Sequence, residues 1–105
     1  MGMTKKEFDK MRDTARDAAK DSYEKARDAT FANNEHFYGD VKKEAASTAI
    51  EAAGKVMIDM GATPEMVDTM KDIANKEFIE RYNYGGGITT PAQCVFMTLI
   101  EMAPK

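Results

Sequence analysis

The sequence predicts an all-α fold: a single domain of four helices, in which a long N-terminal helix forms an alanine-rich antiparallel hairpin and the C-terminal helix is apolar. Two observations lead to this. Small and apolar residues recur at intervals of three and four, which is helical spacing, and no segment alternates as a half-buried strand does. Capping and breaking residues delimit four such stretches, at about 4–30, 41–60, 64–82 and 91–103. The length of 105 residues fits one domain, 1–105.

The first helix is predicted to begin with a capping box, Thr4-Lys5-Lys6-Glu7, in which the hydroxyl and the carboxylate both bind free amide groups. One side of it carries small and apolar residues at helical spacing, namely Phe8, Met11, Ala15, Ala18, Ser22, Ala26 and Ala29. Opposite charges three or four residues apart should support it, in the pairs Asp9 with Arg12, Asp13 with Arg16, Asp17 with Lys20, and Asp21 with Lys25.

The second helix follows the turn-rich segment FANNEHFYGD, in which Asp40 is the expected N-cap, and Gly61 marks its end. Its expected packing side consists of Ala45, Ala49, Ala52, Ala53, Val56 and Met60. Because both of the first two helices carry alanine stripes, we expect them to pack closely as an antiparallel hairpin. The rings of Phe31, Phe37 and Tyr38 are expected to fill the space at its turn.

The third helix starts at Thr63-Pro64-Glu65, where a cap, a proline and an acid suit a helix N-terminus. Its apolar side is expected to comprise Met66, Val67, Met70, Ile73, Ala74, Phe78 and Tyr82. Three glycines, 85–87, then precede the capping box Thr90-x-x-Gln93 of the last helix. We interpret the glycines as a joint between helices rather than a phosphate loop, because no strand precedes them and no lysine follows. Whether they also bind a ligand stays open.

The last helix is apolar nearly all round, so it is expected to be enclosed by the other helices or to lie in a subunit interface. Six methionines could fill an irregular core or line a groove or dimer seam, namely Met57, Met60, Met66, Met70, Met97 and Met102. Two tyrosines flank the glycine joint, and tyrosine is favoured in binding surfaces. The candidate partner-binding residues are therefore Tyr82, Tyr84, Met66, Met70, Phe96, Met97 and Ile100.

No catalytic, cofactor-binding or metal-binding set is predicted, so the chain is not expected to be an enzyme or to need a cofactor. His36 lies near Glu35 and Asp40, but the spacing matches no zinc or EF-hand pattern, and we interpret it as a surface turn residue. Cys94, the one cysteine, has apolar neighbours and is expected to be buried. The aspartates at positions 9, 13, 17 and 21 are interpreted as a solvated helix face.

The composition further limits the expected partners and location of the chain. The 15 basic and 18 acidic residues are intermixed, which argues against nucleic acid as the main ligand. No apolar run approaches the ~20 residues of a membrane span, and no signal peptide opens the chain, so we expect no membrane and a cytoplasmic location. A single cysteine fits a reducing compartment.

We therefore expect a small non-enzymatic module that binds another protein as a regulator or inhibitor. We also expect a homodimer, with the last helix and part of the third at its seam. Small size, mixed charge and the lack of a catalytic set resemble the products of phages and mobile elements that bind host machinery. The alternative is a nucleic-acid-associated protein that uses the basic residues of the first helix, namely Lys5, Lys6, Lys10, Arg12 and Arg16.

Overall fold

The computed structural model describes residues 3–83 and 89–103 of the chain. It contains four helices, α1 (Lys5–Ala32), α2 (Asp40–Asp59), α3 (Pro64–Asn83) and α4 (Pro91–Met102), and the described residues include no strand. The predicted all-α fold is confirmed. Each predicted helix is present, and its ends differ from the predicted ones by two residues at most.

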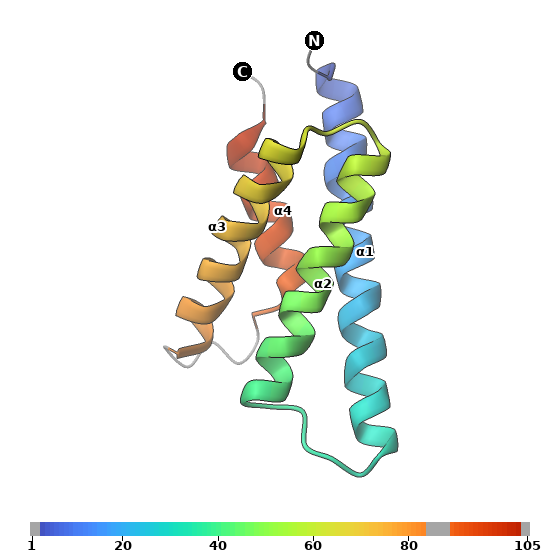
Figure 1. Cartoon of the computed structure of the whole chain (residues 1–105), viewed down its shortest axis with the longest axis vertical. Helices are drawn as coiled ribbons and strands as arrows, with labels where there is room; N and C mark the ends of the chain where they lie inside the picture. The colour runs from blue at the N-terminus through green and yellow to red at the C-terminus, as the bar shows by residue number, and fades with distance from the viewer. Residues whose placement is uncertain (1–2, 84–88, 104–105) are drawn as a thin grey trace.

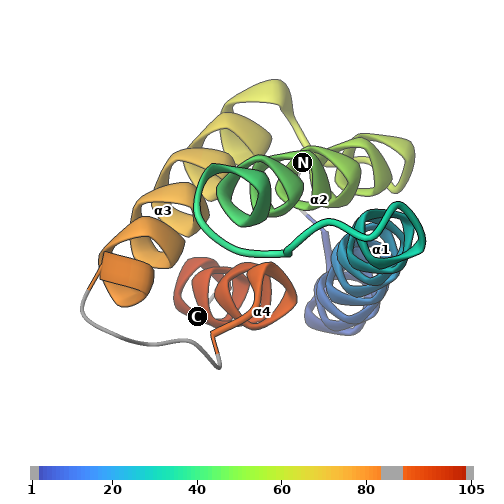
Figure 2. The same cartoon turned by 90° about the horizontal axis from the view of Figure 1, so that it is seen from below.

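Successive helices run antiparallel, so that α1 and α3 descend and α2 and α4 ascend in Figure 1. Helix α1 packs against α2 and α4, and α3 packs against the same two helices, but the described parts of α1 and α3 do not meet. Figure 2, which looks along the bundle, shows α4 between α1 and α3. Helix α2 also touches α4, and lies on its inner side. The outer side of α4 is therefore not covered by any described helix.

Helix α1 spans most of the molecule. Its 28 residues extend about 42 Å at ~1.5 Å per residue, and the longest dimension of the molecule is 48 Å. The predicted capping box is confirmed, because the Thr4 amide donates to Glu7 Oε1 at 3.0 Å and the Glu7 amide donates to Thr4 Oγ1 at 3.1 Å. Three of the four predicted ion pairs are present, namely Asp9 with Arg12, Asp13 with Arg16, and Asp21 with Lys25. Asp17 pairs with Arg16 instead of Lys20.

The first two helices form the predicted antiparallel hairpin, and alanines lie at its centre. The buried alanines of the two helices are Ala15, Ala19, Ala45, Ala46, Ala49 and Ala53. The rotation of α1 differs from the prediction: Ala19 and Tyr23 are buried, whereas Ala18 and Ser22 are partly exposed and Ala29 is exposed. The reason is that α1 must face α4 as well as α2, which turns its buried stripe by one residue.

On α2 the buried side is also broader than predicted. Ala46, Ile50 and Met57 belong to the core, whereas the predicted members Ala52, Val56 and Met60 are only partly buried. Helix α2 packs against all three other helices, so a single narrow stripe does not describe it. Its glycine, Gly54, lies against α3, where an added Cβ would come within 3.0 Å of Val67 Cγ1.

The connection between α1 and α2 departs from the prediction at its cap. Gly39, not Asp40, is the N-cap of α2, and its φ of 65° is a conformation that glycine adopts at little cost. The Gly39 amide donates to the Tyr82 hydroxyl at 2.7 Å, which ties the connection to the end of α3. Of the three rings expected to fill the turn, only Phe37 is partly buried, with its centroid 5.2 Å from that of Tyr23.

The other two rings of that turn are open to solvent, since Phe31 is 55% and Tyr38 63% exposed. On α3, the expected apolar side is present except for Ile73, which is 36% exposed. Helix α4 begins with the predicted Thr90 cap, whose hydroxyl accepts a hydrogen bond from the Gln93 amide at 3.2 Å. Within the described residues Gln93 does not return a bond, so only half of the second capping box forms.

Candidate protein-binding surface

Helix α4 has one packed side and one open side. Its buried residues are Pro91, Ala92, Cys94, Val95, Thr98 and Leu99. On the opposite side Gln93 is exposed, Met97 is 46% and Ile100 45% exposed, and Phe96 is half-buried. We call Gln93, Phe96, Met97 and Ile100 the α4 surface. The helix that reads as apolar all round therefore leaves part of its apolar area uncovered by the described chain.

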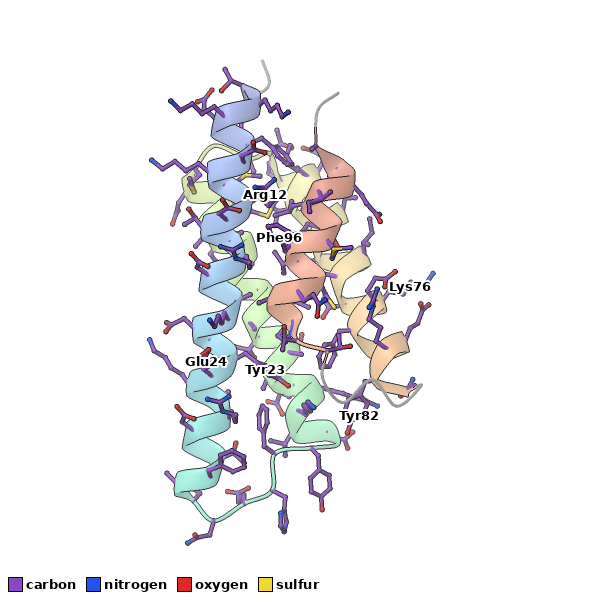
Figure 3. The ribbon with its side chains drawn as sticks, turned by 180° about the vertical axis from the view of Figure 1, so that it is seen from behind. Arg12, Tyr23, Glu24, Lys76, Tyr82 and Phe96 are labelled. Carbon is purple, nitrogen blue, oxygen red and sulfur yellow. The ribbon has the colours of Figure 1, made fainter. Side chains whose placement is uncertain are left out.

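The side of the α4 surface next to α1 is covered by two arginines. The guanidinium carbons of Arg12 and Arg16 lie 4.9 and 5.2 Å from the centroid of the Phe96 ring. Figure 3 shows Arg12 and Phe96 beside each other where α1 meets α4. A guanidinium over an aromatic face contributes about 0.5–1 kcal/mol where it is exposed. The two arginines therefore favour this position of the ring and place basic side chains, paired with aspartates, along this edge.

Aspartates on α1 hold these arginines. Arg12 donates to Asp9 Oδ1 and to Asp13 Oδ1, both at 3.1 Å. Arg16 donates to Asp17 Oδ1 at 3.2 Å. The acidic residues interpreted as a solvated face thus have a second effect, since they orient the side chains that cover Phe96.

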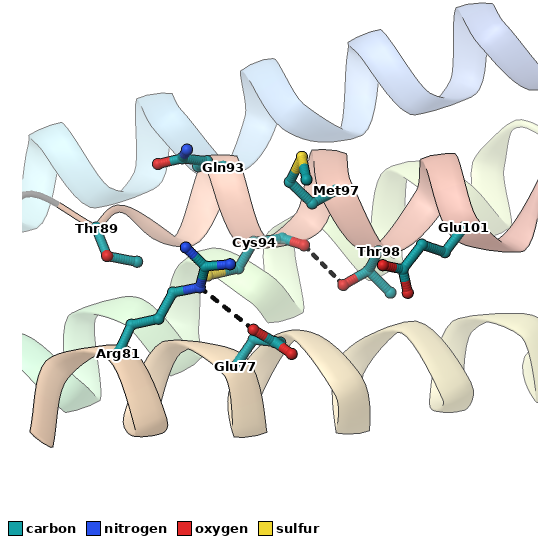
Figure 4. Close-up of a pocket in the computed structure, with 8 residues that line it drawn as sticks. All are labelled: Glu77, Arg81, Thr89, Gln93, Cys94, Met97, Thr98 and Glu101. Carbon is teal, nitrogen blue, oxygen red and sulfur yellow. Dashed lines mark hydrogen bonds and ion pairs between the residues drawn. The ribbon is translucent and has the colours of Figure 1, made fainter. Parts of the chain in front are cut away.

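On its other side α4 meets α3 across a small pocket, shown in Figure 4. The pocket is lined by Glu77, Arg81, Thr89, Gln93, Cys94, Met97, Thr98 and Glu101. Arg81 Nε donates to Glu77 Oε2 at 3.2 Å, and the Thr98 hydroxyl donates to the Cys94 carbonyl at 2.7 Å. Its cavity volume is about 60 Å³, whereas pockets for drug-sized ligands occupy roughly 300–1,000 Å³. As formed by the described residues, the pocket has room for solvent or one side chain.

Cys94 faces this pocket but is not activated by it. The residue is 4% exposed, as predicted. Burial raises the pKa of its thiol to about 11, while Arg81 lowers that pKa and Glu77 raises it by smaller amounts. Because the thiolate is the nucleophilic form, the thiol is unreactive near neutral pH.

The predicted partner-binding residues do not all lie together. Phe96, Met97 and Ile100 share the α4 surface. Met66 is partly buried near the start of α3. Met70 is fully buried, because it lies on the core side of α3 with Val67, Ala74 and Phe78, so it is not a surface residue.

The Tyr82 side chain contacts other parts of the fold and is not free for a partner. It is partly buried, its ring stacks on Phe78 with centroids 6.2 Å apart, and its hydroxyl accepts the hydrogen bond from Gly39. Two lysine ammonium groups, on Lys42 and Lys43, lie 5.5 and 5.3 Å from its ring centroid. Tyr84 and the glycines at 85–87 lie outside the described residues.

The charged groups that border the α4 surface are not apparent from the sequence. The aspartate–arginine pairs of α1 were visible as helix-supporting charges, but their contact with Phe96 joins residues about eighty positions apart. Glu77 and Glu101 carried no local signal at all. Other large apolar side chains are exposed on other helices, among them Ile58 on α2 and Ile79 on α3, each 44% exposed.

The chain matches no known protein family, and no curated protein or solved structure matches it either. Across the described ranges, no helix combines the length and the apolar character needed to cross a membrane. The same residues contain no group of three histidine, cysteine or acidic side chains arranged to hold a metal ion.

Proposed function

We propose that this protein is a small non-enzymatic module that binds another protein, as a regulator or inhibitor, through the α4 surface. One observation carries the proposal: Met97 and Ile100 are nearly half exposed beside Phe96 on a helix whose other side is fully packed. Contiguous exposed apolar groups often mark protein–protein contacts. Aromatic residues and methionine are both enriched at the centre of such contacts.

Two side chains of the α4 surface, and the charged groups beside it, also favour contact with a protein. Phe96 already contacts Arg12 and Arg16, which reduces the side-chain freedom that is lost when a partner covers its ring. Met97 is flexible and can adapt to the shape of the partner. Charged groups on both sides give the apolar centre a polar rim, as in many interfaces.

The nucleic-acid alternative receives less support from the same residues. Arg12 and Arg16 belong to its proposed basic set, but both are paired with aspartates of α1 and lie over Phe96. Nucleic-acid affinity depends on basic groups that are free to neutralise phosphates. Binding of a protein to the α4 surface would leave Arg12 and Arg16 in these contacts.

The test is capture of partners from a lysate of the native host with tagged parent chain and two matched variants. Ile100→Glu places a charge on the α4 surface, whereas Ile79→Glu places one on α3 away from it. The two isoleucines are 45% and 44% exposed, so the direct effects on folding should be similar. A charge in an apolar contact is costly. We expect a partner that the parent and Ile79→Glu retain and Ile100→Glu loses; equal retention by both variants would place binding elsewhere.

A further inference from the structure

The charged side chains nearest to the two edges of the α4 surface are of opposite sign. Successive residues of a helix are rotated by about 100°. The order across the surface, from the α1 edge to the α3 edge, is therefore Phe96, Ile100, Gln93, Met97, Glu101. Arg12 and Arg16 lie over Phe96 at the first edge. Glu77 and Glu101 line the pocket beside Met97 at the second.

The charges at both edges are within reach of a partner. The side chains of Arg12 and Arg16 are 21% and 40% exposed. Their partners Asp9, Asp13 and Asp17 lie farther round α1 from Phe96, so the arginines are the charged groups nearest to the α4 surface on this side. Glu101 is exposed and forms no ion pair with the described residues. Glu77 is paired with Arg81, so Glu101 supplies most of the negative charge at its edge.

We infer that a partner of the α4 surface is a second copy of this chain, with the two α4 helices parallel about a two-fold axis that runs along them. The inference rests on the proposed function, namely that this surface binds a protein, and a second copy and a different protein would compete for it. Its basis is charge complementarity within a single surface. In a two-fold pair each contact occurs twice, so a surface pairs with itself only if its own edges are complementary.

The direction of the axis decides which edges meet. An axis parallel to α4 exchanges the two edges, so the arginine edge of each copy faces the glutamate edge of the other. An axis across α4 would make the helices antiparallel and would set each edge opposite itself, arginine against arginine and glutamate against glutamate. Opposed like charges are unfavourable at an interface. The charged side chains nearest to the surface therefore favour the parallel pair.

The parallel pair also sets the apolar contacts. Gln93 and Ile100 are two turns apart and lie near the middle of the surface, so each would lie opposite its own counterpart. Phe96 of one copy would lie against Met97 of the other, and contacts between sulfur and aromatic rings are favourable. In an antiparallel pair Gln93 would instead lie opposite Ile100.

Disulfide cross-linking distinguishes these arrangements. Gln93→Cys and Ile100→Cys are each made in a Cys94→Ala background, with Ile79→Cys as the control on α3. Positions 93 and 100 are about 10.5 Å apart along the helix, whereas a disulfide needs Cβ atoms about 3.5–4.5 Å apart. Under mild oxidation we expect Gln93→Cys alone and Ile100→Cys alone to shift from monomer to covalent dimer, well above Ile79→Cys. A mixture of the two, carrying different tags, should give no mixed disulfide.

Two results would overturn the inference. Cross-linking that appears only in the mixture would show an antiparallel pair. Cross-linking no stronger than that of Ile79→Cys, together with a monomeric parent by light scattering at high micromolar concentration, would show that no second copy binds. Light scattering uses the unchanged chain, so the test survives if a cysteine variant fails to fold. The second result would not contradict the proposed function, because the capture experiment tests whether the α4 surface binds a different protein.

Discussion

At the scale of single residues, the buried hydroxyl of Tyr23 stands out. The residue is 7% exposed, and its ring lies edge-on to Phe37 and Phe78, with centroids 5.2 and 6.5 Å away. Among the described residues its hydroxyl has no hydrogen-bond partner. Burial raises the pKa of Tyr23 to about 12, an effect that the charge of Arg27 partly opposes. A buried hydroxyl that is unpaired loses its hydration without compensation.

Tyr23→Phe is therefore expected to leave the free energy of unfolding unchanged or to raise it by up to about 1 kcal/mol. The matched control is Tyr82→Phe, because the Tyr82 hydroxyl does accept a hydrogen bond from Gly39. Loss of that bond should cost about 0.5–1.5 kcal/mol. Urea denaturation of both variants and the parent measures the difference. If Tyr23→Phe costs as much as Tyr82→Phe, the Tyr23 hydroxyl has a partner.

Burial of two weak acids also predicts a loss of stability in alkali. The pKa of Cys94 rises from 9.0 to about 11 and that of Tyr23 from 10.0 to about 12. The folded chain holds both protons more tightly than the unfolded chain, so this contribution is complete below pH 9.0 and is lost as the pH rises through about 11 and 12. The variant Cys94→Ala/Tyr23→Phe should show a smaller fall of the urea midpoint with pH than the parent. Equal slopes would mean that neither group is desolvated in the folded chain.

At the scale of helices, the sequence predicted where each helix lies better than how it is rotated. Caps and breakers are local, so the Thr4–Glu7 box and the Thr90 cap place helix starts without tertiary information. Rotation is different, because adjacent alanines such as Ala18 and Ala19 allow two assignments of the buried side. The contact with α4 decides between them. Likewise Gly39 is the cap instead of Asp40, and its amide donates to the hydroxyl of Tyr82, 43 residues away, a contact that no local pattern predicts.

The close contact between α1 and α2 makes a prediction of its own. Ala49 is fully buried in that contact, and Ala49→Leu is expected to lower the free energy of unfolding by about 1–3 kcal/mol because the added volume forces the helices apart. Ala29→Leu is the control, since Ala29 is exposed near the end of α1. It should change stability by no more than about 0.5 kcal/mol. Thermal or urea melts that do not separate the two variants would mean that α1 and α2 do not pack through their alanines.

At the scale of the whole molecule, the order of packing creates the candidate site. Because α1 and α3 do not meet, α4 fills the space between them and keeps one side open. The sequence predicted Phe96, Met97 and Ile100 as partner-binding residues, since an apolar helix must be covered by something, and all three lie on the open side of α4. It could not identify Arg12 or Glu77 as their neighbours, because both positions depend on how distant helices pack.

Reversing the charges at the two edges of that open side tests the parallel pair. In the parallel pair, Arg16→Glu places an acidic side chain opposite the glutamate edge of the other copy in both contacts. Glu101→Arg places a basic side chain opposite the arginine edge in both contacts. Each variant alone should therefore dimerise more weakly than the parent, by about ten-fold in Kd. An equimolar mixture should recover the parent affinity, because both edges of the mixed pair again combine opposite charges.

The control for this exchange is Arg27→Glu. Arg27 lies on α1 away from Phe96, is paired with Asp28 as Arg16 is with Asp17, and has a side chain 43% exposed against 40% for Arg16. It should dimerise like the parent. Size exclusion coupled to light scattering gives the affinities, and raising the salt concentration should shrink the differences, since exposed charges are screened. A mixture that dimerises no more strongly than its separate components would exclude the arrangement in which the arginine edge faces the glutamate edge. A mixture that dimerises more strongly than the parent would indicate the antiparallel pair, in which the parent itself opposes like charges.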